Sequence, residues 1–214
     1  MTLNQNDVRE ILLAVCDRVI EKESWFCRLD SVVGDGDHGV TMTRGFKAMR
    51  EATRGEMSVK ELLETAGAAL GASMGGAIGP IYGVMLKSMG MKADTKPLTA
   101  RKLAEMLEQS RSMVQVVANV QEGQKTIYDA FSPAVTAFAA EAEASNSIPA
   151  AAERAAEAAK QGADATMDMT AKKGRARFLG ERSKGHIDAG AASFSVISET
   201  ISSWIKNKDM AVSK

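Results

Sequence analysis

The chain has few of the residues that mark specialised protein classes. Among its 214 residues are two cysteines, two histidines and four prolines, and only 5% are aromatic. Two cysteines cannot build the disulfide framework of a small secreted domain, so Cys16 and Cys27 are interpreted as buried thiols in a reduced compartment. No apolar run approaches the ~20 residues of a membrane span, and the polar N-terminus does not resemble a signal peptide. We therefore expect a cytoplasmic protein that does not associate with membranes.

An excess charge of one sign is also missing, because 27 Lys and Arg residues balance 27 Asp and Glu residues. This balance provides no general electrostatic attraction for nucleic acid, and no nucleic-acid partner is predicted. The length is sufficient for one sizeable hydrophobic core. Residues 1–214 are therefore predicted to form a single domain.

Apolar residues recur at helical spacing, as Val8, Ile11, Leu12 and Val15 do near the N-terminus. No segment alternates apolar and polar residues for long enough to form a strand, so an all-α fold is predicted. Eight helices with mostly short connections favour an up-and-down antiparallel arrangement. Pro133 is the residue that fits least well inside a helix. The expected helices lie near 5–25, 39–52 and 58–72, after Gly76 as far as Gly90, from Thr99 to Val117, and near 126–143, 148–170 and 189–206.

The segment from Leu29 to Gly39 is the most informative in the chain, because it places Asp30, Asp35 and Asp37 among three glycines. Magnesium prefers oxygen ligands, and a glycine-broken loop allows carboxylates at these offsets to converge. The alternative is an Asp-Gly turn in which Asp37 caps the next helix. An EF-hand is disfavoured, since its ligand spacing is missing.

A second cluster, residues 71–80, contains Gly71, Gly75, Gly76 and Gly79 just before a predicted helix. Glycines at a helix start allow backbone N–H groups to approach a phosphate. Close packing in a helical hairpin is the alternative. The cluster is not a Walker A motif, because no Gly-Lys-Ser/Thr follows.

The long connection 171–189 contains six Lys or Arg residues, His186 and three glycines. A basic loop with glycine hinges is typical of a lid over an anion. It could instead be a solvated loop, or a nucleic-acid contact for which Phe178 is the one stacking residue. A metal loop, a glycine loop and a cationic lid together indicate phosphoryl transfer.

These segments resemble the DhaL family, the nucleotide-binding subunits of dihydroxyacetone kinases, over nearly the full length. The resemblance rests on these motifs: Gly34-Asp35-Gly36-Asp37-His38-Gly39 with Arg44-Gly45-Phe46, Gly75-Gly76-Ala77 with Gly79-Pro80, Lys125-Thr126 with Asp129, and Leu179-Gly180-Glu181-Arg182-Ser183 with Gly185-His186 and Asp188.

The resemblance implies an eight-helix antiparallel barrel with ADP or ATP and two magnesium ions in the loops at one end. It assigns no certain catalytic residue to this chain, and places Arg175 in the lid as a phosphate or nucleotide contact. The implied metal ligands are Asp30, Asp35 and Asp37. The implied nucleotide contacts are His38, Gly39, Val40, Thr41, Gly76, Ala77, Ile78, Ala118, Thr126, Ile127, Arg175, Asp188, Ala189 and Gly190.

The resemblance also implies partners. In the family, a separate DhaK subunit holds the ketone covalently, and the phosphate comes from ATP or from a DhaM-like phosphotransferase protein. A homodimer and a role as a nucleotide-loaded module that contacts a transcription regulator remain open. Ile78, Ala118 and Ala189 depart from the usual family residues and suggest a divergent branch, such as one acting on erythrulose.

Overall fold

The computed structural model describes residues 1–94 and 96–212, and almost all of its ordered elements are helices. Among these residues the pairing of Leu3 with Leu98 is the sole β-bridge. The α-helices are α1 (Gln5–Glu21), α2 (Glu23–Val33), α3 (His38–Ala52), α4 (Val59–Ser73), α5 (Ile78–Gly90), α6 (Ala100–Ala118), α7 (Tyr128–Ser145), α8 (Ile148–Ala165) and α9 (Ala189–Val212). Two 3₁₀ segments, η1 (Thr166–Asp168) and η2 (Arg175–Ser183), lie between α8 and α9.

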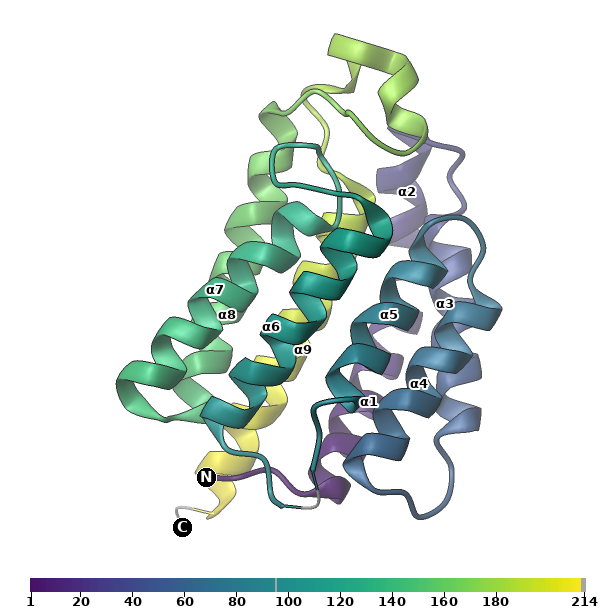
Figure 1. Cartoon of the computed structure of the whole chain (residues 1–214). Coiled ribbons are helices and arrows are strands. Elements are labelled where there is room, and N and C mark those ends of the chain that lie inside the picture. Colours follow the sequence, from purple (N-terminus) through teal and green to yellow (C-terminus); the bar gives the residue numbers. More distant parts are fainter. Residues whose placement is uncertain (95, 213–214) are drawn as a thin grey trace.

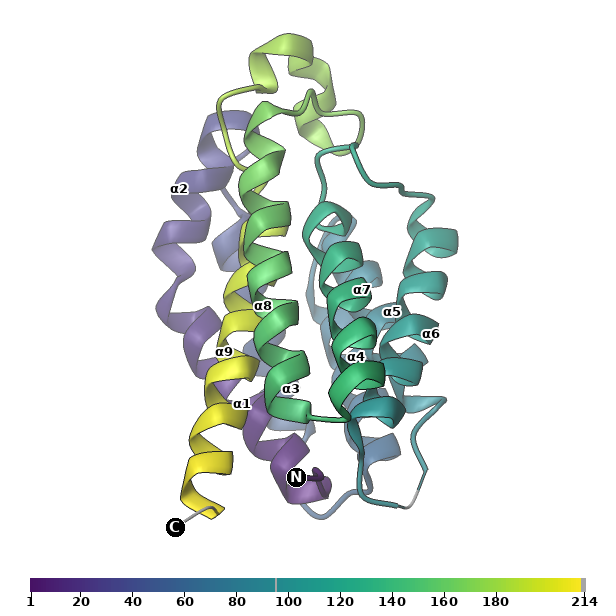
Figure 2. The same cartoon turned by 90° about the vertical axis from the view of Figure 1, so that its left-hand side faces the viewer.

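Eight of these helices form a closed ring, as expected. Each of α3 to α9 packs against the next, and α1 closes the ring by packing against both α9 and α3. The ninth helix, α2, packs against α3 and α9. Figures 1 and 2 show the helices running alternately up and down, with both chain termini at the end opposite η2.

The helix starts follow from local side-chain chemistry. Ser58 and Glu61 form the capping box predicted from their spacing, and each satisfies a backbone N–H at the start of α4. The Ser147 side chain accepts from the Ala150 N–H at the start of α8. Pro133 lies inside α7 without ending it. Because proline has no N–H, the Asp129 carbonyl loses its helical donor, and Gly162 of α8 packs closely against this carbonyl.

Several expected boundaries were wrong, and the last helix runs to Val212 instead of residue 206. The first helix does not run to residue 25, because it ends at Glu21 and α2 begins after Lys22. Asp30 therefore lies in the last turn of a helix, and not in a loop. The seventh helix ends at Ala165, and η1 follows it. The connection 171–189, expected to be a glycine-hinged lid loop, contains the 3₁₀ segment η2.

The interior of the ring is apolar. Side chains from all eight ring helices enclose a void of about 200 Å³, among them Ile11, Phe46, Met106 and Phe131. Methionines such as Met42, Met49 and Met106 are completely or almost completely buried, consistent with their predicted use as flexible filling between helices. Within the described residues, no helix is both long and apolar enough to cross a membrane.

The alternation of helix direction decides where the motifs meet. Every second connection of an up-and-down bundle lies at the same end. The connections α2–α3, α4–α5, α6–α7 and α8–α9 therefore converge at one end, at the top of Figure 1. These four connections carry the acidic segment, the glycine cluster, the Lys125-Thr126 motif and the basic segment.

Candidate nucleotide and metal site

The four connections surround a cavity of about 610 Å³. The acidic segment and the start of α3 form one wall, and the glycine cluster forms another. The α6–α7 connection and residues 173–176 and 188–190 complete the lining. A cavity of this size is in the range of pockets for small molecules. The tertiary structure thus joins motifs that are up to about 160 positions apart in sequence.

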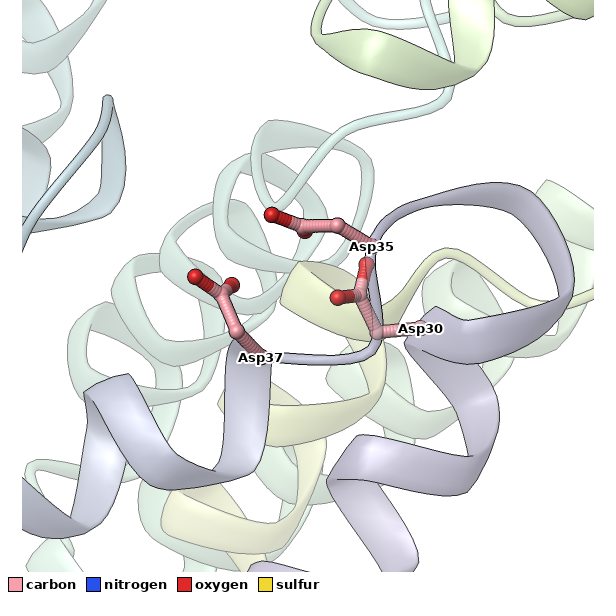
Figure 3. Close-up of side chains that lie close together, drawn as sticks. All are labelled: Asp30, Asp35 and Asp37. Atoms are coloured by element: carbon pink, nitrogen blue, oxygen red, sulfur yellow. The ribbon is translucent and has the colours of Figure 1, made fainter.

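The three aspartates of the acidic segment come together at this cavity. One oxygen from each of Asp30, Asp35 and Asp37 can be chosen so that all lie within 4.8 Å of one another. Asp30 comes from the last turn of α2, Asp35 from the connection, and Asp37 from the N-cap position of α3. Figure 3 shows the three side chains gathered on one side of this turn. The alternative of a capping turn fails, because the Asp37 side chain makes no capping hydrogen bond.

This donor set fits a hard divalent cation. Carboxylate oxygens are the ligands that magnesium prefers, and Asp35 and Asp37 are exposed enough to accept an ion from solvent. Asp30 is held in place, since its Oδ2 accepts from the His38 N–H at 3.3 Å. Three carboxylates this close repel one another, so a cation that neutralises them is favoured.

The segment 171–190 contributes a cation to the same cluster. The Arg175 guanidinium forms an ion pair with Asp35. This pair is mostly exposed, so its own contribution to stability is small. Its importance is positional, because it joins η2 to the acidic segment across the cavity.

The glycine cluster presents the start of α5 to the cavity. Gly76 has a φ of +66°, a conformation that side-chain-bearing residues rarely adopt, and it precedes Ala77 and Ile78 at the helix start. The Ala77 N-cap position has no side-chain hydrogen bond. Backbone N–H groups and the positive end of the helix dipole are therefore directed toward the cavity, an arrangement that suits phosphate. Arg44 supports the preceding turn, since its Nε donates to the Ser73 carbonyl at 2.7 Å.

His38 connects the starts of α3 and α9. Its Nε2 lies 3.0 Å from the Ser193 hydroxyl, which itself donates to the Gly190 carbonyl at 2.9 Å. Burial lowers the pKa of His38. The imidazole is therefore mostly neutral near pH 7, and it orients the backbone near the acidic cluster without adding charge.

Two buried charged groups shape the α6–α7 connection. The Asp129 carboxylate accepts from the N–H groups of Gly123 at 2.5 Å and Thr126 at 2.7 Å. The Lys125 side chain donates to carbonyls of the segment between α8 and α9. Thr126 and Ile127 are thereby presented to the cavity.

Most of the predicted site residues lie at this cavity. The residues that line it are Asp30, Asp35, Asp37, His38, Thr41, Gly76, Ala77, Ile78, Ala118, Thr126, Ile127, Arg175, Asp188, Ala189 and Gly190.

Gly39 and Val40 do not line the cavity. A Cβ at Gly39 would collide with the Glu23 carbonyl and the Cys27 sulfur, so Gly39 allows α2 and α3 to pack closely. The Val40 side chain is half exposed to solvent. A nucleotide role for these two residues rests on the resemblance alone.

The sequence interpretation assigned no role to Arg44 and Lys125, although both line the cavity. Both were quoted in the motifs that carry the resemblance, and this was the signal that could have identified them. Pro80, which was also quoted in those motifs, lines the cavity too, as do Val117, Val120 and Ile81, which were missed. They carry no chemical signature, because ordinary core residues have the same types and spacing.

Comparison with known proteins confirms the resemblance. Residues 32–203 match the model of the DAK2 domain family. The ADP-binding DhaL subunit of PEP-dependent dihydroxyacetone kinase 1 from Listeria innocua serovar 6a is 32% identical, with 85% of this chain and 87% of that subunit covered. The corresponding Escherichia coli K12 subunit is also 32% identical, with 90% and 93% covered.

Longer relatives match over part of their length only. An L-erythrulose kinase from Pectobacterium atrosepticum is 33% identical over 96% of this chain but 36% of its own length. The crystal structure of the C. freundii dihydroxyacetone kinase in complex with AMP-PNP and Mg²⁺ has a TM-score of 0.71 at 22% identity. That match covers 95% of this chain and 34% of the kinase, and it shows that the fold is shared. Since the family model matches most of the chain and relatives above 30% identity cover it almost completely, the chain belongs to the DAK2 domain family as a DhaL-like protein.

Proposed function

We propose that this chain is the nucleotide- and magnesium-binding subunit of a kinase that phosphorylates dihydroxyacetone or a closely related short ketose. One observation carries the proposal: three carboxylates with oxygens within 4.8 Å line the same cavity as a glycine-preceded helix start. Phosphoryl transfer needs a cation beside the phosphates and oriented N–H donors around them. The names of the DhaL relatives from Listeria and Escherichia support the same activity.

In this proposal Asp30, Asp35 and Asp37 bind two magnesium ions together with the nucleotide phosphates. Three carboxylates neutralise only part of the charge of two divalent ions, so phosphate oxygens are expected to complete the coordination. When bound, magnesium would supply charge neutralisation at the phosphate oxygens.

The chain's own residues bind and orient the nucleotide. The N–H groups of Ala77 and Ile78 receive phosphate at the start of α5, next to Gly76. His38 and Thr41 line the wall beside the acidic cluster. Ala118, Thr126 and Ile127 form the side proposed for the base. Arg175 closes over the phosphates, and Asp188, Ala189 and Gly190 close over the nucleotide.

The ketone is proposed to be held by a partner subunit of the DhaK type. Of the two histidines of this chain, His38 is not free to hold it, because its imidazole is buried against Ser193. The PEP-dependent relatives favour a resident ADP that a DhaM-like protein rephosphorylates, with exchangeable ATP as the alternative donor. Erythrulose is the second candidate substrate, because erythrulose kinases are among the relatives.

The test measures Mg²⁺-dependent ADP binding by calorimetry, and then ketone phosphorylation with and without a DhaK-like partner. We expect binding by the chain alone, turnover only with the partner, and loss of turnover in Asp35→Asn and Asp37→Asn. Glu143→Gln is the matched control, since this exposed carboxylate lies in the last turn of α7, at the end of that helix away from the α6–α7 connection. Normal turnover of either aspartate variant, or turnover by the isolated chain, would contradict the proposal.

A further inference from the structure

Lys125 is an unusual residue for the position it occupies. The residue is 2% exposed, although lysine is rarely buried so completely unless it is paired. Its backbone has a φ of +59°, which few residues other than glycine adopt. Two unfavourable features at one position indicate that the surrounding structure requires this side chain here.

The Lys125 ammonium joins the two ends of the segment between α8 and α9. Its Nζ donates to the Thr166 carbonyl and to the His186 carbonyl, each at 2.5 Å. Thr166 is the first residue after α8, and His186 lies three positions before α9. Both ends of the basic segment are therefore attached to one cation in the α6–α7 connection.

Further hydrogen bonds hold the same ends together. The Gly185 N–H donates to the Met167 carbonyl at 2.8 Å, and the Asp188 N–H donates to the Thr166 hydroxyl at 2.9 Å. Between these ends, residues 171–184 carry the cations of the basic segment. The two ends of the segment are therefore hydrogen-bonded together, and residues 171–184 protrude from them as a loop. The contacts of Lys125 with residues 166 and 186 are called the clasp.

The charges around Lys125 suit a fixed ammonium. Burial lowers the pKa of Lys125, while the carboxylates of Asp188, Asp129 and Asp168 oppose this effect. The Asp188 carboxylate already has a hydrogen-bond donor, since its Oδ2 accepts from the Ala191 N–H at the start of α9. The ammonium is thus directed at backbone carbonyls with compensating negative charge nearby.

We propose that Lys125 is a positioning residue that clasps residues 166 and 186 and thereby aligns the basic segment and the Thr126-Ile127 edge of the cavity over a bound nucleotide. The inference rests on the proposed nucleotide site, and it assigns Lys125 no phosphate contact. Loss of the clasp leaves the acidic cluster and the start of α5 in place, but it frees the Thr126-Ile127 edge and removes the fixed hinge from which the basic segment closes.

The first experiment measures hydrogen exchange of the wild-type chain without ligand. The Gly185 and Asp188 amides should exchange at least about tenfold more slowly than the amides of 175–182, because the clasp protects them. In Lys125→Met this difference should disappear. If the Gly185 and Asp188 amides of the wild-type chain exchange as fast as the amides of 175–182, the proposal is overturned. This outcome does not depend on the folding of any variant.

The second experiment compares the affinities for Mg-ADP and for adenosine, which has no phosphate. We expect Lys125→Met to weaken both by a similar factor of about 10 to 100, the usual effect of losing a supporting group around a site. Lys125→Arg should recover part of the loss, since it also donates to carbonyls. A loss confined to Mg-ADP would overturn the proposal in favour of direct phosphate binding, and unchanged affinities would overturn it outright.

Lys172→Met is the matched control, because Lys172 is a lysine of the basic segment whose side chain has no part in the clasp. The two hypotheses fail in different ways. If the wild-type chain binds neither ligand, the proposed function fails while the exchange experiment still tests the clasp. If the wild-type chain binds and Lys125→Met binds equally well, the clasp fails while the proposed function stands.

Discussion

Arg175 and Asp35 form an ion pair across the mouth of the cavity, so the basic segment contacts the acidic cluster directly. The same carboxylate is a proposed metal ligand. A magnesium ion bound there and the Arg175 guanidinium would therefore act on one group. The first prediction follows from this shared carboxylate.

We expect Arg175→Ala to weaken Mg-ADP binding by about tenfold, since a charge-assisted contact is lost. Arg175→Lys should not restore it, because lysine lacks the planar fork of arginine. Hydrogen exchange across 171–190 should slow on addition of Mg-ADP in the wild-type chain and much less in the alanine variant. Arg177→Ala is the control, since Arg177 stacks on Phe178 of the same segment. A lid would be excluded if Mg-ADP left the protection of 171–190 unchanged in the wild-type chain and Arg175→Ala bound Mg-ADP as tightly as the wild-type chain.

Gly39→Ala should destabilise the fold by about 1 to 3 kcal/mol, the usual cost of overpacking. The added Cβ would collide with the Glu23 carbonyl of α2 and push α2 from α3. Urea unfolding measures the change. Gly71→Ala is the matched control, because its Cβ would meet only ordinary contacts and alanine favours a helix. Equal urea midpoints for Gly39→Ala and the wild-type chain would contradict the close packing of α2 against α3 at Gly39.

The two thiols should differ in reactivity. Cys16 is completely buried, and burial raises the pKa of its thiol to about 11. Cys27 is partly exposed. Because the thiolate is the reactive form, iodoacetamide at pH 8 should modify Cys27 in the native chain and Cys16 only after unfolding. Mass spectrometry of timed samples measures both rates, and comparable native rates would show that Cys16 is not enclosed.

The stability of the fold should depend on Asp188 in a defined pH range. Burial raises the pKa of Asp188 from its ordinary value of 3.8 to about 6. The folded chain therefore holds a proton that the unfolded chain releases, and this contribution to stability is lost as pH rises from about 4 to about 6. It amounts to at most about 3 kcal/mol.

Asp188→Asn cannot titrate, so its free energy of unfolding relative to wild type should increase across that range and stay level above pH 7. Thermal or urea unfolding of both proteins between pH 4 and 8 measures this difference. A difference that does not change with pH would mean that the pKa of Asp188 is not shifted in the folded chain. A difference that decreases would mean that the shift has the opposite sign.

Several features of the site could be predicted from the sequence because their causes are local. The capping box of Ser58 and Glu61 needs only residues three positions apart. The carboxylates of Asp35 and Asp37 are two positions apart, so they come close in any compact turn. The helices themselves follow from apolar spacing, which is a property of one segment at a time.

Other features could not be predicted, because they depend on distant partners. Nothing near Lys22 in sequence marks the break between α1 and α2, so Asp30 was placed in a loop and not in a helix. Gly39 looks like a nucleotide-loop glycine until Glu23 and Cys27 are seen beside it. The role of Lys125 requires Thr166 and His186, which lie 41 and 61 positions away.

The sequence alone determined an all-α chain with an acidic segment, a glycine cluster and a basic segment, since residue type and spacing specify helices and turns. The same residue types predict metal-binding chemistry in the acidic segment. Only the tertiary structure decided that these segments meet in one cavity. Closure of the ring by α1 and α9 and the alternation of helix direction place all four connections at one end. Such long-range packing depends on the shapes of many surfaces fitting at once, and no single segment encodes it.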